Sequence, residues 1–117
     1  MREEILNGKI PLPDLRYLKE MVGDDTETLK EIISIFIEES PETLKSLRES
    51  VESRDFERLK SVTHSLATEL AMLGVTSIVN DVKIISKSGS EMDNLDETVD
   101  KIVKTVVYSV EYFKTII

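Results

Sequence analysis

One side chain in this 117-residue chain is the first candidate for chemistry. His64 is the only histidine, and it lies in the stretch "SVTHSLATELAMLG" at residues 61–74. An imidazole can act as a base or a nucleophile near neutral pH, which few other side chains can do. The chain contains no cysteine, so thiolate catalysis and zinc–thiolate sites are excluded. What His64 can do depends on whether it faces a core or solvent.

Two common uses of a histidine do not fit its surroundings. A serine nucleophile would need a further base beside it, and the chain offers no second histidine. A carboxylate-bridged metal site in a helical bundle uses Glu-x-x-His pairs on two helices, but Ser61 stands three residues before His64. We therefore expect neither catalysis by this chain alone nor a metal site or cofactor on it.

Helical spacing predicts that His64 points outward. At about 100° per residue, the apolar residues around it fall on one stripe, and His64 lies nearly opposite that stripe. Its near neighbours along the helix are small where a surface helix usually carries long charged side chains, so the ring is open to a large partner. An ordinary surface histidine would satisfy the same pattern. The stripe consists of Leu59, Val62, Leu66, Leu70 and Leu73, and the small neighbours are Ser61, Ala67, Thr68 and Ala71.

The same stretch resembles the phosphoacceptor motif of histidine-containing phosphotransfer (HPt) domains. That motif reads H-x-L-K-G, with a second glycine ten positions after the histidine, and His64, Leu66 and Gly74 match it in identity and spacing. Residues 14–66 are similar to the lead-in of the family as well. The resemblance implies a four-helix bundle that carries a phosphoryl group on His64. It also implies that receiver domains of response regulators, or a hybrid histidine kinase, are the partners and supply the divalent metal.

Two positions depart from the family motif. Ala67 stands where the family usually has lysine, a cation for the phosphoryl group, and Thr68 stands where it usually has a glycine that allows close approach. Lys60 precedes His64 by one turn on the outer face. Lys83 and Lys87 flank Ser86, which an antiparallel neighbouring helix would bring to the level of His64. We expect these three lysines to be candidate replacements for the missing cation, although each also fits a solvated surface charge.

Apolar periodicity predicts helices along almost the whole chain. We expect an irregular lead-in at residues 1–13, then a domain at residues 14–117 that opens with a short helix at 14–22. Asp24 with Glu27 has the pattern of a capping box for a long helix that reaches Ser53 and is kinked at Pro41. The next helix is expected between Asp55 and Gly74, as N-cap and stop. Thr76 or Ser77 is expected to cap a shorter helix, which ends in the loop at 86–94. The last expected helix has an apolar stripe of Leu95, Val99, Ile102, Val106, Val110, Phe113 and Ile117.

Short connections make neighbouring helices antiparallel. The predicted fold class is therefore all-α: an antiparallel up-down four-helix bundle preceded by a short N-terminal helix.

Composition and charge exclude other classes of protein. The net charge is −8, which opposes binding to the phosphates of a nucleic acid or to an anionic membrane. No apolar run approaches the ~18 residues of a membrane span, and "MREEILNGK" at the start lacks the apolar stretch of a signal peptide. We expect a cytoplasmic protein, either free-standing or part of a larger one, for which a monomer would suffice.

Three functions fit these residues. The first is phosphoryl transfer through His64. The second is a docking module that keeps the fold and binds receiver domains without carrying phosphate, which the absence of lysine and glycine after His64 favours. The third is a helical oligomerisation domain, since Ile35 and Ile84 fall off their apolar stripes and would be exposed. Of these, we favour transfer.

Overall fold

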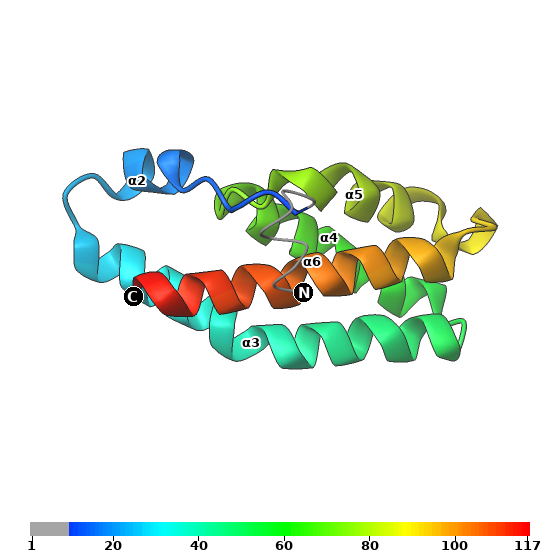
Figure 1. Ribbon diagram of the computed structural model, residues 1–117. Coiled ribbons are helices and arrows are strands. Elements are labelled where there is room, and N and C mark those ends of the chain that lie inside the picture. The colour runs from blue at the N-terminus through cyan, green and yellow to red at the C-terminus, as the bar shows by residue number, and fades with distance from the viewer. Residues whose placement is uncertain (1–9) are drawn as a thin grey trace.

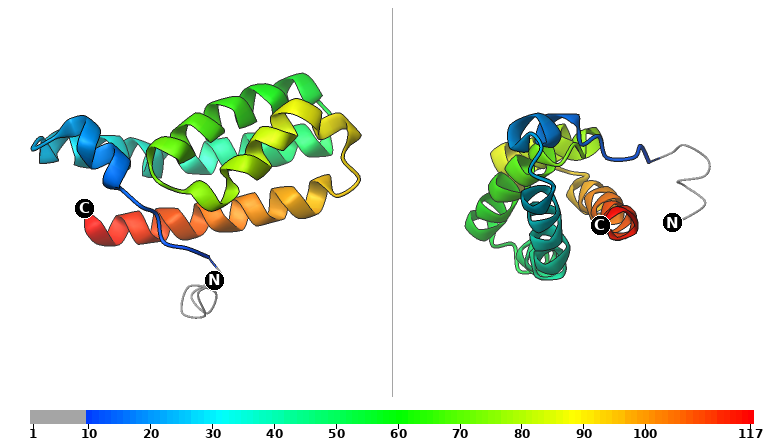
Figure 2. Two further views of the ribbon diagram at one scale, coloured as in Figure 1. Left: turned by 90° about the horizontal axis from the view of Figure 1, so that it is seen from above. Right: turned by 90° about the vertical axis from the view of Figure 1, so that its left-hand side faces the viewer.

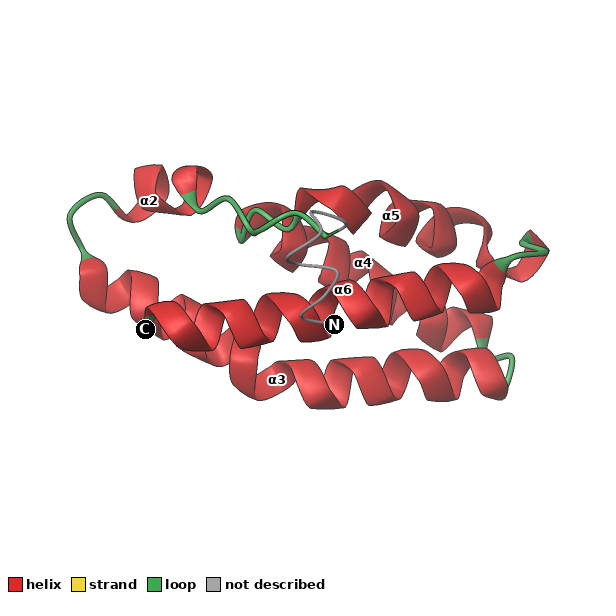
Figure 3. Ribbon diagram, in the orientation of Figure 1, coloured by secondary structure: helices red, strands yellow, loops and turns green. Residues whose placement is uncertain are grey.

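The computed structural model describes residues 10–117, and the part it describes is helical, with no strand (Figures 1 and 3). This confirms the all-α prediction. The predicted irregular lead-in lies mostly outside the described residues, and helix α2 begins two residues later than expected. The α-helices are α2 (Arg16–Val22), α3 (Thr26–Glu52), α4 (Phe56–Met72), α5 (Val79–Ser88) and α6 (Leu95–Ile116), and two 3₁₀ turns, Thr76–Ile78 and Gly89–Glu91, flank α5.

The four longer helices α3 to α6 run alternately up and down. α3 packs against α4 and α6, and α5 packs mainly against α4. α3 and α6 are longer than α4 and α5 and extend past them at one end of the bundle, where the short helix α2 lies (Figure 2). Helix α4, which carries His64, is therefore flanked by α3 on one side and α5 on the other.

The helix starts confirm one predicted cap and correct two. Asp55 caps α4 by accepting a hydrogen bond from the Arg58 amide, as predicted. The cap of α3 is Asp25 rather than Asp24, because the helix begins one residue later and the amide that needs a partner belongs to Thr28. Neither Thr76 nor Ser77 caps α5. Both lie in a 3₁₀ turn that leads into the helix.

Pro41 bends α3 without dividing it. The helix is continuous through the proline, as expected, and Figure 1 shows it changing direction along its length. Proline has no amide hydrogen, so the carbonyl of Ile37 loses its usual helical partner. The buried Ser40 side chain donates a hydrogen bond to the Phe36 carbonyl in the same turn.

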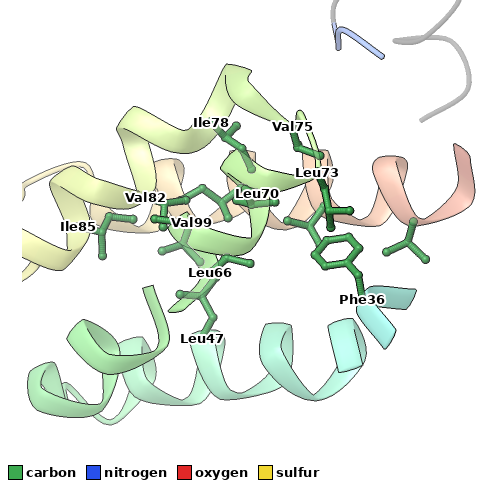
Figure 4. Close-up of a cluster of buried hydrophobic side chains, with 14 of the residues drawn as sticks. Phe36, Leu47, Leu66, Leu70, Leu73, Val75, Ile78, Val82, Ile85 and Val99 are labelled. Atoms are coloured by element: carbon green, nitrogen blue, oxygen red, sulfur yellow. The ribbon is translucent and has the colours of Figure 1, made fainter. Parts of the chain in front are cut away.

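The core lies where the apolar stripes meet. Leu66 and Leu70 of α4 and its C-cap Leu73 point into it together with side chains from the other long helices (Figure 4). Phe36 and Phe113 close one end with an edge-to-face contact, their ring centroids 5.9 Å apart. The stripe prediction was wrong for Ile117, which is 46% exposed at the end of α6, and it missed the buried Tyr108.

Candidate functional site

His64 lies near the middle of α4 with its side chain exposed. Leu59, Leu66 and Leu70 of the same helix are buried, so the predicted opposition between the histidine and the apolar stripe is present in the structure. A position within a packed helix fixes the backbone beneath the imidazole, which leaves only its two side-chain torsions to rotate. The ring is therefore presented to solvent from a rigid base.

A hollow of about 820 Å³ opens beside His64, and we call it the histidine hollow. Helix α2 and the consecutive helices α4 and α5 form it. One part of its wall is basic and another is apolar. The lining residues are Tyr17, Met21, Lys60, His64, Ala67, Thr68, Ala71, Met72, Lys83, Ser86 and Lys87.

The basic wall consists of the three lysines singled out in the sequence. Lys60 comes from α4, and Lys83 and Lys87 come from α5. Within residues 10–117, none of the three forms an ion pair with a carboxylate. The hydroxyl of Ser86 lies 3.5 Å from the Lys60 carbonyl, which places this part of α5 beside the turn that precedes His64, close to the level expected. The lysine charges are available to an anion at the imidazole.

The apolar wall is provided by α2 and by the C-terminal end of α4. Tyr17 and Met21 are 58% and 57% exposed, and Ala71 and Met72 line the hollow next to them. Large apolar side chains exposed together commonly mark a protein-binding surface. Sequence reasoning missed Tyr17 and Met21. Their separation of four residues places them on one face of the short helix, and the neighbouring Leu18 is fully buried. This spacing could have indicated a shared exposed face.

The four predicted small neighbours of His64 differ in exposure and in the groove that they line. Thr68 is exposed in the hollow, its hydroxyl 3.4 Å from the His64 carbonyl, and Ala71 lies next to it. Ala67 is only 6% exposed, because its methyl group packs into the core cluster at the base of the hollow, so it is not the open surface residue we expected. Ser61 lies outside the hollow and lines a polar groove between α3 and α4.

Gly74 also lies outside the histidine hollow. It follows Leu73, the C-cap of α4, with a φ of +74°, a conformation that favours glycine, which confirms it as the stop of the helix. Its backbone contacts the segment that leads into α2.

The two sides of α4 differ in charge: side chains of both signs line the groove on the α3 side, whereas no acidic side chain of the described residues lines the histidine hollow. Glu69 lines the grooves on the α3 side, where burial and the nearby Glu39 carboxylate raise its pKa. The lysines of the histidine hollow lie on the α5 side, and no carboxylate lines that hollow. The acidic groups of the bundle therefore do not neutralise the basic wall locally, although the whole chain carries a net charge of −8.

The part of the chain that the structure describes shows no metal-binding cluster of three or more His, Cys, Asp or Glu side chains. Among the same residues, no helix is long and apolar enough to cross a membrane.

Comparison with known protein families shows which family has this sequence pattern. The model of the Hpt domain family matches residues 31–105, a range that contains His64 and runs from α3 into α6. The chain belongs to the Hpt family. Hpt domains are phosphotransfer modules of two-component signalling, and the recognition made from the motif is confirmed. No curated protein and no solved structure matches the chain.

The family match leaves part of the histidine hollow uncovered. It begins at Glu31, so α2 with Tyr17 and Met21 precedes it. In this Hpt domain the basic wall and the histidine lie within the matched range, whereas most of the apolar wall's exposed surface comes from a helix outside it.

Proposed function

We propose that this Hpt domain accepts a phosphoryl group on His64 from the phosphoaspartate of a receiver domain and passes it to another response regulator. The observation that carries the proposal is the exposed imidazole in a hollow whose three lysines have no carboxylate partners within the described residues. A phosphoryl group is an anion, and charge-assisted contacts to it are stronger than neutral ones. The hollow thus suits the charge of the phosphorylated state.

The transfer step is an in-line displacement at phosphorus. The lone pair of Nε2, the ring nitrogen farther from the backbone, forms the N–P bond. The P–O bond to the receiver aspartate breaks, and its electron pair leaves with the carboxylate. The imidazolium that results releases its Nδ1 proton to water. Transfer to a second receiver reverses these events, and positioning and charge neutralisation supply most of the rate.

The two chains have different tasks in this proposal. The receiver supplies the divalent metal and most of the catalytic groups, while this domain holds the imidazole still and contributes lysines. It acts as a phosphocarrier without a cofactor of its own and without independent enzymatic activity. A monomer in the cytoplasm suffices for this role, with a receiver domain or a hybrid histidine kinase as donor.

The apolar wall suits the same partner. A receiver that reaches His64 must cover the histidine hollow, and Tyr17 and Met21 offer apolar area beside the basic wall. Burial of such area stabilises a complex by roughly 25 cal/mol per Å² before the costs of association. We expect the lysines to neutralise the charge of the phosphoryl group and the apolar wall to contact the partner.

A docking module that carries no phosphate is the second candidate. It is favoured by Ala67, whose methyl group is buried where the family motif usually places a lysine. In that function the histidine hollow would still bind receivers, and His64 would serve as a contact only.

Transfer from a phosphorylated receiver separates the two functions. The measurement follows acid-labile phosphate on this protein for wild type and His64→Gln, across a panel of receivers. We expect label on wild type and none on His64→Gln, while both proteins bind the receiver. Tight binding of a receiver without label on wild type would establish the docking module instead.

A further inference from the structure

Gly74 contacts the segment leading into α2 at very short range. Its carbonyl accepts a hydrogen bond from the Asp14 amide, with a nitrogen–oxygen distance of 3.0 Å. A Cβ at position 74 would lie 1.7 Å from the Asp14 carbonyl oxygen and 2.7 Å from its nitrogen. Figure 1 shows this segment crossing the α4–α5 connection on its way to α2. Only a residue without a side chain fits beneath that crossing.

Asp14 links this crossing to α2. Its carboxylate accepts a hydrogen bond from the Arg16 amide at 3.0 Å and is paired with the Arg16 guanidinium at 2.6 Å. The hydrogen bonds from the Arg16 side chain and amide, together with the Arg16 charge, lower the pKa of Asp14 to about 2. Tyr17 follows three residues after the backbone anchor, and Leu18 is fully buried. The start of α2 is therefore held to the end of the acceptor helix.

We propose that Gly74 and Asp14 are positioning residues that hold Tyr17 and Met21 in the histidine hollow for the incoming receiver. The inference rests on the proposed function, because it assigns those side chains to the receiver contact. In this proposal Gly74 does more than end α4. Because it has no side chain, the end of α4 can contact the segment that leads into α2, the helix that carries Tyr17 and Met21.

A second glycine provides a matched control. Gly23, after α2, has a φ of +62° and Gly74 has a φ of +74°, so alanine is strained at both positions. A Cβ at Gly23 would have no atom within 4 Å, however. Gly23→Ala thus introduces the backbone strain alone, whereas Gly74→Ala also displaces Asp14.

The test measures transfer from a phosphorylated receiver as a function of receiver concentration. For Gly74→Ala we expect the half-saturating concentration to rise about tenfold, with the maximal rate unchanged, because the partner contact is lost and the reacting groups are not. The half-saturating concentration for Gly23→Ala should stay within about twofold of wild type.

A combined variant tests whether Gly74 acts through the apolar wall. In a Tyr17→Ala/Met21→Ala background, Gly74→Ala should have little further effect, since the side chains that it positions are already absent. Equal shifts in Gly74→Ala and Gly23→Ala, or additive effects in the combined variant, would overturn the proposal.

Asp14→Ala keeps the test decisive if Gly74→Ala does not fold. Asp14 is exposed, so its removal loosens α2 without disturbing the core. The half-saturating concentration should rise about threefold, and no change would count against the proposal.

Amide exchange separates this inference from the proposed function. If the small donor phosphoramidate and every receiver leave wild type unlabelled, the proposed function fails. The link itself is then judged by exchange of the Lys19 amide, which is bonded to the Leu15 carbonyl in α2. Faster exchange in Gly74→Ala but not in Gly23→Ala would support the link, and unchanged exchange in Gly74→Ala would refute it.

Discussion

At the scale of single residues, the site combines one exposed imidazole with three lysines from two neighbouring helices. His64 and Lys60 lie one turn apart on α4, and α5 adds Lys83 and Lys87 from the side. The family lysine after the histidine is replaced by Ala67, whose small side chain packs into the core and leaves the hollow above it open. We infer that Lys83 and Lys87 of α5 supply positive charge that Ala67 cannot.

This inference predicts the effect of removing charge from α5. Lys83→Gln and Lys87→Gln should each slow transfer from a phosphorylated receiver by roughly 3- to 10-fold, because each removes a charge-assisted contact that solvent partly screens. The same variants should shorten the lifetime of the phosphorylated protein. Both quantities can be followed by loss of acid-labile phosphate.

Lys30→Gln is the matched control for charge. Lys30 lines a separate hollow formed with α2 and α6, so its removal changes the net charge equally and leaves the histidine hollow intact. If all three variants slow transfer to the same degree, overall charge would explain the effect, and the assignment of Lys83 and Lys87 would be wrong.

At the scale of elements, aspartate side chains cap the starts of α3 and α4. Asp25 accepts hydrogen bonds from both the amide and the hydroxyl of Thr28, at 3.0 and 2.6 Å. These contacts lower the pKa of Asp25. Two adjacent aspartates precede α3, and either fits a cap pattern, so sequence alone could not choose between them. The Thr28 hydroxyl bond supplies the preference in the folded protein.

The cap assignment predicts a difference between neighbouring aspartates. Asp25→Ala should lower the free energy of unfolding at pH 7, whereas Asp24→Ala should change it little. A carboxylate whose pKa is lowered on folding stabilises the protein above its unfolded pKa and loses that effect as the pH falls. The Asp25→Ala deficit should therefore shrink below about pH 4, near the unfolded aspartate pKa. Denaturant melts of both variants at pH 7 and pH 3 test this, and a larger loss in Asp24→Ala would contradict the assignment.

At the scale of the whole molecule, the bundle was predictable and the hollow was only partly so. Apolar periodicity located the long helices because their buried faces are apolar, and it placed His64 outward opposite Leu66. The antiparallel α4–α5 pair was also enough to bring Lys83, Ser86 and Lys87 near the acceptor helix. These inferences need only local spacing and short connections.

The contribution of α2 required the folded chain. Tyr17 and Met21 reach the hollow because Asp14 crosses Gly74, a contact between segments about sixty residues apart that no local pattern encodes. Buried Ala67 and buried Tyr108 were missed for a similar reason: their exposure depends on neighbouring elements rather than on a single helical stripe. The functional surface is thus a property of three elements together.

The most direct test of the central claim is an NMR spectrum of the only imidazole in the chain. Untagged, ¹⁵N-labelled protein is treated with phosphoramidate, and long-range ¹H–¹⁵N and ³¹P spectra are recorded before and after acidification. Because the chain has one histidine, every imidazole signal belongs to His64. We predict that phosphorus becomes coupled to Nε2 and that the coupling disappears in acid. Unchanged imidazole signals, in a protein that still binds receivers, would contradict phosphoryl transfer through His64.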